Sequence, residues 1–338
     1  MIIITQPGAS EEQIEQIVAR VEEFGLEAEV SRGGSRVIVG VTGPAELVRD
    51  QRISSMPGVE AVVPASTHYK LAAFEARGAA SKVDICGVSV GGDSAVALIC
   101  GPCSVESREQ MLSVARRVKD AGARILRGGA FKPRTSPYSF QGLQEEGLRF
   151  LAEARNETGL PVITEVMDSR DLPIIERYAD CLQIGARNMH NFSLLKEVGR
   201  SHLPVLLKRG FSATINELVM SAEYVLSAGQ EHVMLCERGI RTFETATRFT
   251  LDLTAVPILK AKTHLPVVVD PAHAVGLRAF VPQMALAAVA AGADAIMLEV
   301  HDSPDAAKCD GEQALVPETL SKLFPRLRAV ANAIGRDL

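Results

Sequence analysis

The 338-residue chain lacks the features of membrane, secreted and nucleic-acid-binding proteins. No apolar run approaches the roughly 18–20 residues of a membrane-spanning helix. The first residues, MIIITQPGAS, lack the basic start and cleavage site of a signal peptide, so we expect a cytoplasmic protein. The six cysteines are irregularly spaced, which favours reduced thiols over a disulfide framework. A net charge of −5 argues against nucleic acid as a partner, so any anion site must come from locally clustered cations.

The sequence does contain a cation-rich loop, residues 127–143 (RGGAFKPRTSPYSFQGL). Its prolines and adjacent glycines exclude a helix interior and predict a stiffened loop at the end of a buried strand. Its polar side chains include Arg127, Lys132, Arg134, Thr135 and Ser136. Guanidinium groups bind phosphate and carboxylate through paired hydrogen bonds, and hydroxyls add short ones, so the loop suits an anionic ligand. The alternative is a solvated loop whose cations face water.

Residues 1–65 show the element order of a small α+β domain. We expect strands at 1–6, 26–31, 36–41 and 59–63, and helices at 10–25 and 44–53, the first helix opened by a capping box at Ser10 and Gln13. This β-α-β-β-α-β order is that of a ferredoxin-like domain. The stretch holds no cluster of catalytic candidates, so we expect a regulatory or oligomerising role, with a linker at 66–81. The apolar runs 2–4 and 37–39 exceed what two short helices can cover, which predicts a partner domain or a ligand on the sheet.

Residues 82–338 show a regular alternation of strand and helix. After a hairpin-like stretch at 82–90, apolar runs occur at 95–99, 124–126, 161–163, 181–184, 204–207, 232–235, 266–269 and 293–298. Helical patterns follow them at 110–121, 144–157, 171–178, 192–198, 214–228, 244–259, 278–290 and 317–334. Eight buried strands alternating with helices predict a (β/α)8 barrel. The alternative, an open doubly wound sheet, lacks a G-x-G-x-x-G motif after an early strand.

The active face of such a barrel lies at the carboxyl ends of its strands. Cations follow the second, fourth, fifth and sixth runs: Arg127, Lys132, Arg187, Lys208 and Arg238. Potential metal ligands follow the first, seventh and eighth runs, which adjoin in a closed barrel: Cys103, His273, Glu299 and Asp310. Thiolate, imidazole and carboxylate together fit a borderline-soft divalent ion. Each also has a plainer interpretation: a buried thiol, a capping histidine, or a glutamate paired with a barrel arginine.

Several segments of the sequence resemble those of one enzyme family. GPCSVES, RGGAFKPRTSPYSFQGL, TEVMD, LQIGARN, PVLLKRG, CERGIRTFE, DPAH and LEVH are similar to those of 3-deoxy-D-arabino-heptulosonate 7-phosphate (DAHP) synthase, type Iβ, which has a ferredoxin-like N-terminal domain. The resemblance implies a metal-dependent condensation of phosphoenolpyruvate with D-erythrose 4-phosphate, the first step of the shikimate pathway. The alternative is the sister enzyme 3-deoxy-octulosonate 8-phosphate synthase, which uses arabinose 5-phosphate. Its loop reads K-A-N-R-S where this chain has KPRTS at 132–136.

Carried over position by position, the resemblance implies three sites. Phosphoenolpyruvate would bind Arg127, Lys132, Arg187, Lys208 and Arg238, with Glu165 ordering a water molecule. The phosphate of erythrose 4-phosphate would bind Arg134, Thr135 and Ser136. A divalent metal ion, Mn²⁺ first and Fe²⁺, Co²⁺ or Zn²⁺ as alternatives, would bind Cys103, His273, Glu299 and Asp310. One departure is Ala272, which stands in the DPAH segment where the family has serine.

The chemistry is assigned to Lys132, Cys103 and His273. Lys132 is placed to protonate the acceptor's aldehyde oxygen, which the metal polarises, while C3 of phosphoenolpyruvate attacks the aldehyde carbon. Two other classes compete with this assignment. A class I aldolase would use Lys208 or Lys132 as a Schiff-base nucleophile. A non-catalytic anion-binding protein is disfavoured because both halves of the site are intact.

Two further expectations concern regulation. The resemblance implies a homotetramer in which tyrosine or phenylalanine binds the N-terminal domain and shuts the barrel mouth. Separately, Cys309 stands next to the proposed ligand Asp310. We hypothesise that its thiol reaches Cys103 when no metal is bound, and that oxidation then joins the two in a disulfide.

Overall fold

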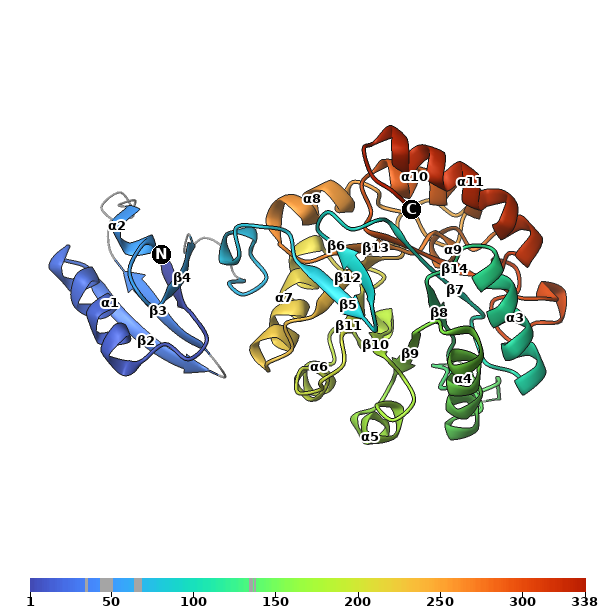
Figure 1. The fold of residues 1–338 in the computed structure, drawn as a ribbon, viewed down its shortest axis with the longest axis horizontal. Helices are drawn as coiled ribbons and strands as arrows, with labels where there is room; N and C mark the ends of the chain where they lie inside the picture. Colours follow the sequence, from blue (N-terminus) through green and yellow to red (C-terminus); the bar gives the residue numbers. More distant parts are fainter. Residues whose placement is uncertain (34–35, 43–50, 64–68, 134–135, 137) are drawn as a thin grey trace.

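The computed structural model describes residues 1–33, 36–42, 51–63, 69–133, 136 and 138–338 (Figure 1). It contains a four-stranded antiparallel sheet near the N-terminus, a two-stranded hairpin and a closed parallel barrel. The predicted fold class, a (β/α)8 barrel with a small ferredoxin-like domain, is confirmed. None of the helices in the described ranges is long and apolar enough to cross a membrane.

The N-terminal domain is a sheet in the order β2-β3-β1-β4. Its elements are β1 (Ile2–Thr5), α1 (Glu11–Glu23), β2 (Glu27–Gly33), β3 (Arg36–Thr42), α2 (Gln51–Ser54) and β4 (Val59–Val63). Helix α1 begins as predicted, because Ser10 Oγ accepts the backbone N–H of Gln13 while the Gln13 side chain accepts that of Ser10. The predicted start of the second helix, at Pro44, lies outside the described residues.

Both faces of this sheet are covered by the chain itself. One face packs against the two helices through Ile3, Ile17, Val21, Val39, Ile53 and Val59. On the other face, Ile2, Ile4, Ala61 and Val63 share a cluster with Tyr69, Ala72, Ala73 and Ala76. The expectation of an uncovered apolar sheet is therefore wrong for β1, whose residues are buried, whereas Val37 and Ile38 of β3 are only half-buried. The reason is that residues 69–76, expected to act only as a linker, pack on the sheet and include a 3-10 turn, η2 (Phe74–Ala76).

The segment after residue 68 also attaches the N-terminal domain to the barrel. Glu223 of α7 (Ile215–Ser227) accepts hydrogen bonds from the backbone N–H groups of Lys70, Leu71 and Ala72 at 2.8, 2.8 and 2.9 Å. Glu231 forms ion pairs with Arg36 at 3.3 Å and with Arg77 at 2.8 Å. One carboxylate on the barrel thus binds a strand of the domain and the segment that follows it.

A hairpin of β5 (Lys82–Ile85) and β6 (Val88–Gly91) closes one end of the barrel. Its apolar side chains Val83, Ile85 and Val90 belong to the same cluster as interior side chains near the amino ends of the barrel strands. Figure 1 shows the hairpin in cyan, lying across the strands. Because this end is plugged, the carboxyl ends of the strands form the accessible face.

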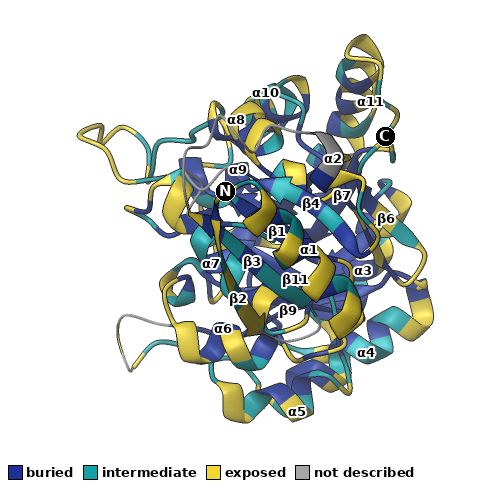
Figure 2. Cartoon of the chain, turned by 90° about the vertical axis from the view of Figure 1, so that its left-hand side faces the viewer, coloured by how far each residue is buried: buried dark blue, intermediate teal, exposed yellow. Residues whose placement is uncertain are grey.

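Eight parallel strands close the barrel, with β14 pairing to β7. They are β7 (Ala97–Gly101), β8 (Ile125–Arg127), β9 (Val162–Val166), β10 (Cys181–Ile184), β11 (Val205–Lys208), β12 (Val233–Glu237), β13 (Val267–Val269) and β14 (Ala295–Glu299). Every predicted run overlaps one strand, and the bounds differ by at most three residues. All strand residues are buried, as expected for a parallel sheet covered by helices (Figure 2).

Helices surround the barrel: α3 (Arg108–Asp120), α4 (Glu145–Thr158), α5 (Leu172–Ile175), α6 (Phe192–Val198), α7, α8 (Ala255–Lys262), α9 (Pro271–Val275), α10 (Val281–Ala290) and α11 (Pro317–Ala333). Short 3-10 turns are η3 (Ser169–Asp171), η4 (Ala186–Asn188) and η5 (Pro304–Ala306). The capping box at Thr214 and Glu217 is present at the start of α7. Figure 2 shows exposed residues along α4 and α5, on the outside of the barrel.

The prediction of a helix over 244–259 is largely wrong, because α8 begins only at Ala255. The preceding residues form a loop closed by a bridge between Ile240 and Thr250. Within it, the Glu244 carboxylate accepts the backbone N–H groups of Thr245 and Ala246, which replaces helical hydrogen bonds. The patterns at 171–178 and 278–290 also overestimate their helices, which are α5 preceded by η3, and α10.

Candidate metal and anion site

Side chains at the carboxyl ends of the barrel strands line a cavity of about 300 Å³. Its lining includes nine of the described residues assigned from the sequence to substrates or metal, all except Cys103 and Glu299: Arg127, Lys132, Ser136, Glu165, Arg187, Lys208, Arg238, His273 and Asp310. The structure therefore brings these side chains to one face of the barrel. Arg134 and Thr135 lie outside the described residues.

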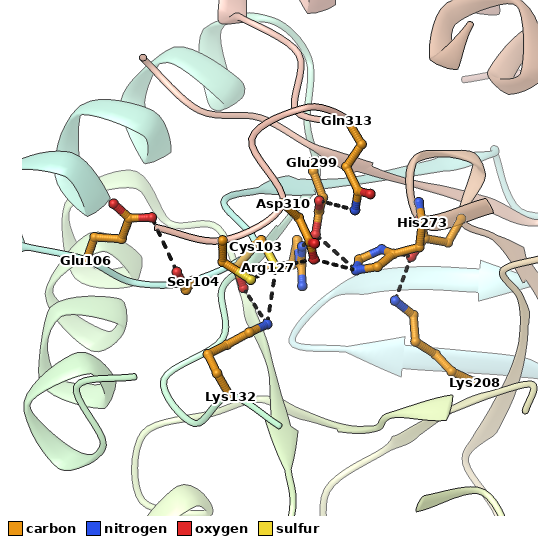
Figure 3. A network of polar contacts seen from close by, with 12 residues as sticks. Cys103, Ser104, Glu106, Arg127, Lys132, Lys208, His273, Glu299, Asp310 and Gln313 are labelled. Atoms are coloured by element: carbon orange, nitrogen blue, oxygen red, sulfur yellow. Dashed lines mark hydrogen bonds and ion pairs between the residues drawn. The ribbon is translucent and has the colours of Figure 1, made fainter. Parts of the chain in front are cut away.

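Cys103, His273, Glu299 and Asp310 form a cluster at this cavity, with ligand atoms all within 4.8 Å of one another. His273 Nε2 lies 3.2 Å from Glu299 Oε1 and 3.8 Å from Asp310 Oδ2. Cys103 Sγ lies 3.2 Å from Asp310 Oδ2 (Figure 3). The cluster offers one sulfur, one imidazole nitrogen and two carboxylates, from the ends of β7, β13 and β14 and the loop after β14. This donor set fits a borderline-soft divalent ion.

The His273 ring is oriented by Asp270, the residue that precedes α9. Asp270 accepts the backbone N–H of His273 at 3.0 Å and lies 2.7 Å from ring Nδ1, which directs Nε2 toward the cluster. Lys208 Nζ lies 2.6 Å from the same carboxylate. Burial acts to raise the pKa of Asp270, but His273 and Lys208 outweigh it and hold that pKa well below its ordinary value. Asp270 is therefore ionised, and its negative charge holds the His273 ring and the Lys208 ammonium in place.

Glu299 is fully buried between two donors. Arg127 Nη1 donates to Oε1 at 2.6 Å, and the Gln313 side-chain amide donates to Oε2 at 2.6 Å. Glu299 thus forms the ion pair with a barrel arginine that was the alternative to its role as a metal ligand. The two interpretations are compatible because Oε1 faces His273 Nε2 as well as the guanidinium.

The loop that carries Asp310 is tied to the loop that carries Cys103. Glu106 Oε1 accepts the backbone N–H of Lys308 at 2.8 Å and the Ser104 hydroxyl at 3.3 Å. Asp310 itself has φ of 51°, a left-handed conformation that a non-glycine residue adopts only when its surroundings hold it there. Arg248 Nη1 donates to its second oxygen at 3.2 Å. These contacts present Oδ2 of Asp310 to the cluster.

Lys132 reaches the cluster from the cation-rich loop. Its Nζ donates to the backbone carbonyl of Cys103 at 3.0 Å and to Cys103 Sγ at 3.2 Å (Figure 3). Burial acts to lower the pKa of Lys132, but Cys103 and Glu165 act the other way, and the pKa stands above its ordinary value. The Lys132 ammonium therefore stays protonated. Gly129 leaves room for it, since a Cβ there would lie 2.8 Å from both Lys132 Cδ and the Cys103 carbonyl oxygen.

The cations around the cavity differ in how far their charge is neutralised. Arg127 pairs with Glu299 and Lys208 with Asp270, each at 2.6 Å and buried. In the described part of the chain, neither Arg187 nor Arg238 has a carboxylate at ion-pair distance, and Arg238 Nη1 is buried without a hydrogen-bond partner there. Burial lowers the pKa of Arg238. No paired carboxylate therefore offsets the charge of these two guanidinium groups in the described part of the chain, which leaves them able to bind an incoming anion.

Two other charged residues at strand ends stabilise the barrel wall. Arg209 Nη1 pairs with Glu237 at 2.9 Å and with Asp252 at 2.8 Å. Glu237 also accepts the backbone N–H of Gly239 at 2.7 Å. The network fixes the loop after β12, which carries Arg238, so its role is to hold that loop in place.

Sequence reasoning did not assign Asp270, Gln313 or Arg248 to the site. Asp270 had a signal, because an aspartate three residues before His273 has the spacing of a helix N-cap. Gln313 and Arg248 had none, because each reaches the cluster from a loop whose path only the fold determines. Ala272 is fully buried in the main core cluster, so the missing serine hydroxyl leaves an apolar contact in its place.

The sulfurs of Cys103 and Cys309 lie 3.2 Å apart, as the sequence hypothesis requires. We expect hydrogen peroxide to oxidise the metal-free protein to a Cys103–Cys309 disulfide: the two thiols lose two electrons and two protons, and the peroxide becomes two waters. Metal bound at Cys103 should protect the pair. Peptide mapping should show the linked peptides only in the metal-free sample, and Cys309→Ser should abolish them. Oxidised metal-free protein without this link would contradict the prediction.

Family models and a curated relative match this chain along nearly its whole length. Residues 66–334 match the family model described as the DAHP synthetase I family, and residues 1–67 match the DAHP synthase ferredoxin-like domain. The chain is 44% identical over 335 residues to phospho-2-dehydro-3-deoxyheptonate aldolase of Thermotoga maritima, covering 99% of both chains. A 2-dehydro-3-deoxyphosphooctonate aldolase of Syntrophobacter fumaroxidans is 33% identical over 258 residues, which are 71% of this chain and 88% of that protein.

Solved structures give the same result for the fold. The crystal structure of the Thermotoga maritima phospho-2-dehydro-3-deoxyheptonate aldolase (DAHP synthase) aligns with a TM-score of 0.79 at 44% identity, covering 99% of this chain and 98% of that one. A truncated form of the 3-deoxy-D-arabino-heptulosonate 7-phosphate synthase from the same organism aligns with a TM-score of 0.74 at 43% identity. That form covers 80% of this chain and 98% of its own. The similarity to the octulosonate enzymes is partial, whereas the similarity to the heptulosonate enzyme includes both domains.

Proposed function

The chain belongs to the DAHP synthetase I family and is a transferase that makes DAHP and phosphate from phosphoenolpyruvate and D-erythrose 4-phosphate; we propose that it does so with the residues at this cavity. The reaction opens the shikimate pathway to the aromatic amino acids. The main support for this assignment is that potential metal ligands and cations lie together at one cavity. A four-ligand cluster lies beside two arginines whose charge is not neutralised.

We assign phosphoenolpyruvate to Arg127, Lys132, Arg187, Lys208 and Arg238. The substrate carries a phosphate and a carboxylate, and among the described cations assigned to it Lys132, Arg187 and Arg238 have no carboxylate at ion-pair distance, so their charges can offset those of the substrate. Glu165 lies on the same cavity wall, and a Cβ at Gly185 would collide with its carboxylate. Glycine at 185 therefore lets Glu165 stand where it can orient the water that adds to C2 of the substrate.

A divalent metal ion fits the cluster of Cys103, His273, Glu299 and Asp310, and members of this family are generally metal-dependent. We propose Mn²⁺, with Fe²⁺, Co²⁺ and Zn²⁺ as alternatives that the same donors accept. When bound, the ion supplies Lewis acidity toward the aldehyde oxygen of the acceptor. Asp270, Arg127 and Gln313 orient the ligands for it, as the hydrogen bonds to His273 and Glu299 support.

Lys132 and Glu165 take part in the remaining steps, the proton transfer and the addition of water. C3 of phosphoenolpyruvate attacks the aldehyde carbon, and the Lys132 ammonium donates a proton to the aldehyde oxygen as negative charge develops there. Water held by Glu165 adds to C2, and the resulting hemiketal phosphate collapses with C–O cleavage, releasing inorganic phosphate. The cations neutralise two anionic substrates, which explains a basic cavity on a chain of net charge −5.

The acceptor's phosphate is assigned from the sequence to Arg134 and Thr135, with Ser136 on the cavity wall. Losing a charge-assisted, two-bond contact costs roughly 2–3 kcal/mol, or about two orders of magnitude in binding. Arg134→Ala should therefore raise the KM for erythrose 4-phosphate about a hundredfold and leave the KM for phosphoenolpyruvate nearly unchanged. Steady-state kinetics with each substrate varied in turn measures both. Equal increases in the two KM values would refute the assignment.

Phosphate release from phosphoenolpyruvate tests the proposed function as a whole. We expect rapid release with erythrose 4-phosphate and little with arabinose 5-phosphate, because the loop at 132–136 reads KPRTS and the family match covers both domains. A preference for arabinose 5-phosphate would instead assign the octulosonate reaction.

Regulation, assembly and location complete the proposal. We propose that tyrosine or phenylalanine binds the N-terminal domain, that the assembly is a homotetramer and that the enzyme works in the cytoplasm. The match of residues 1–67 to the ferredoxin-like domain of this family supports a regulatory role for that domain. An effector acts only if it binds one arrangement of the domains better than another. The contacts of Glu223 with residues 70–72, and of Glu231 with Arg36 and Arg77, are among the described links between that domain and the barrel.

A further inference from the structure

Two aromatic rings stack at the edge of the cavity. Phe211 follows β11 and Phe249 lies in the loop after β12; their centroids are 5.2 Å apart and their planes differ by 7°. The loops are also joined through the backbone, because the Arg241 N–H donates to the Phe211 carbonyl at 2.6 Å. The two phenylalanines therefore act as one unit between two strand ends that carry cations.

Guanidinium groups lie over both rings of this pair. Arg238 is 4.9 Å from the Phe211 centroid and 4.4 Å from that of Phe249. Arg187 lies 5.4 Å from the Phe211 centroid. Arg241 lies 5.4 Å from the Phe211 centroid and Arg248 lies 5.7 Å from the Phe249 centroid. Four arginines therefore surround the two rings. Distances below about 6 Å are those at which the negative face of an aromatic ring attracts a cation.

The type of partner decides how much charge a cation can offer. Arg127 and Lys208 have carboxylate partners at 2.6 Å, which cancel most of their charge at a distance. An aromatic face orients a guanidinium but carries no net charge, so it does not offset the charge of Arg187 or Arg238 as a paired carboxylate would. A carboxylate in place of the rings would also repel a bound phosphate. Rings are therefore a suitable support for arginines that must wait for an anion.

We propose that the stacked Phe211–Phe249 pair positions Arg238 and Arg187 for phosphoenolpyruvate. Both phenylalanines are positioning residues that act through the arginines. The inference rests on the proposed function, which assigns these arginines to that substrate. It follows that weakening the rings should weaken phosphoenolpyruvate binding, because the guanidinium groups would then have to be ordered by the substrate itself. The affinity for erythrose 4-phosphate and kcat should change little.

Calorimetric titration of phosphoenolpyruvate into the metal-loaded, full-length protein measures the effect. Phe249→Leu should raise the Kd roughly tenfold, the size expected for a partly desolvated cation–π contact. Phe249→Tyr, which keeps the ring face, should stay within about twofold of the wild type. Phe192 provides the matched control, since it stacks on Tyr224 at 4.5 Å on the outside of the barrel, and Phe192→Leu should leave the Kd unchanged.

Ring fluorination separates charge attraction from shape. Phenylalanines with one, two and three ring fluorines at position 249 keep nearly the same size while the negative face weakens step by step. We expect log Kd for phosphoenolpyruvate to rise with each fluorine at position 249 and to stay flat for the same series at position 192. A purely structural role would give no gradient at either position. This series also serves if Phe249→Leu lowers Tm so far that it cannot be titrated.

A wild-type Kd in Phe249→Leu, or a flat fluorination series at position 249, would overturn the positioning role while leaving the proposed function intact. Failure of the wild-type protein to bind phosphoenolpyruvate at all would overturn the proposed function, and the positioning role with it.

Discussion

Replacing His273 with alanine should strip the protein of its metal and nearly abolish phosphate release. Structural Zn²⁺ binds four-ligand zinc-finger sites with on the order of 10–16 kcal/mol; on that scale one ligand contributes about 3 kcal/mol, or roughly two orders of magnitude in affinity. The loss should be large because Nε2 of His273 lies within 4 Å of both carboxylates of the cluster. Metal content after dialysis, measured by mass spectrometry, and the rate of phosphate release should fall together.

A graded series makes this test specific. Gln313→Ala removes the hydrogen bond to Glu299 but no ligand, so metal affinity should fall by only about 10–100-fold. His202, which is largely exposed, is the matched control, and His202→Ala should retain metal and rate. Normal metal content in dialysed His273→Ala would refute the metal assignment even if the variant were inactive.

Deleting residues 1–65 should leave an active barrel that no aromatic amino acid inhibits. The barrel has its own core, and Glu223 still holds residues 70–72 after the deletion. None of the cavity residues comes from the deleted segment. Inhibition by tyrosine and by phenylalanine should therefore drop from its full-length extent to none, while kcat with both substrates stays within a fewfold.

Inhibition curves for the full chain and the truncated protein measure this difference under the same conditions. Truncation exposes Tyr69, Ala72, Ala73 and Ala76, which pack on the sheet of the domain, so reduced thermal stability is expected and is not evidence against the account. If the truncated enzyme were as sensitive as the full chain, the effector site would have to lie in the barrel.

The barrel and most of the cavity follow from local signals in the sequence. Buried strands such as β10 are short apolar runs. The residues at or just after their carboxyl ends, such as Lys208 and Arg187, must lie at one rim once a parallel barrel closes. The cluster of Cys103, His273 and Glu299 is predictable for the same reason, since β14 pairs with β7 and with β13. Topology converts distant positions in the chain into neighbours.

What the sequence could not predict depends on contacts between loops. The pattern over 244–259 favours a helix, yet Arg248 and Phe249 are held in a loop by Asp310, Gln313 and the ring of Phe211. Residues 69–76 look like a linker but cover one face of the N-terminal sheet. In both cases tertiary contacts outweigh weak local propensities.

Titration of metal into metal-depleted enzyme tests the central claim. That claim is that residues at the carboxyl ends of the barrel strands condense two anionic substrates with the help of a bound metal ion. With phosphoenolpyruvate and erythrose 4-phosphate present, phosphate release should be absent without metal, should rise linearly with added Mn²⁺ and should level off at one equivalent per chain. Undiminished release in excess chelator would contradict the account and would point to a Schiff base at Lys208 or Lys132, which borohydride would trap.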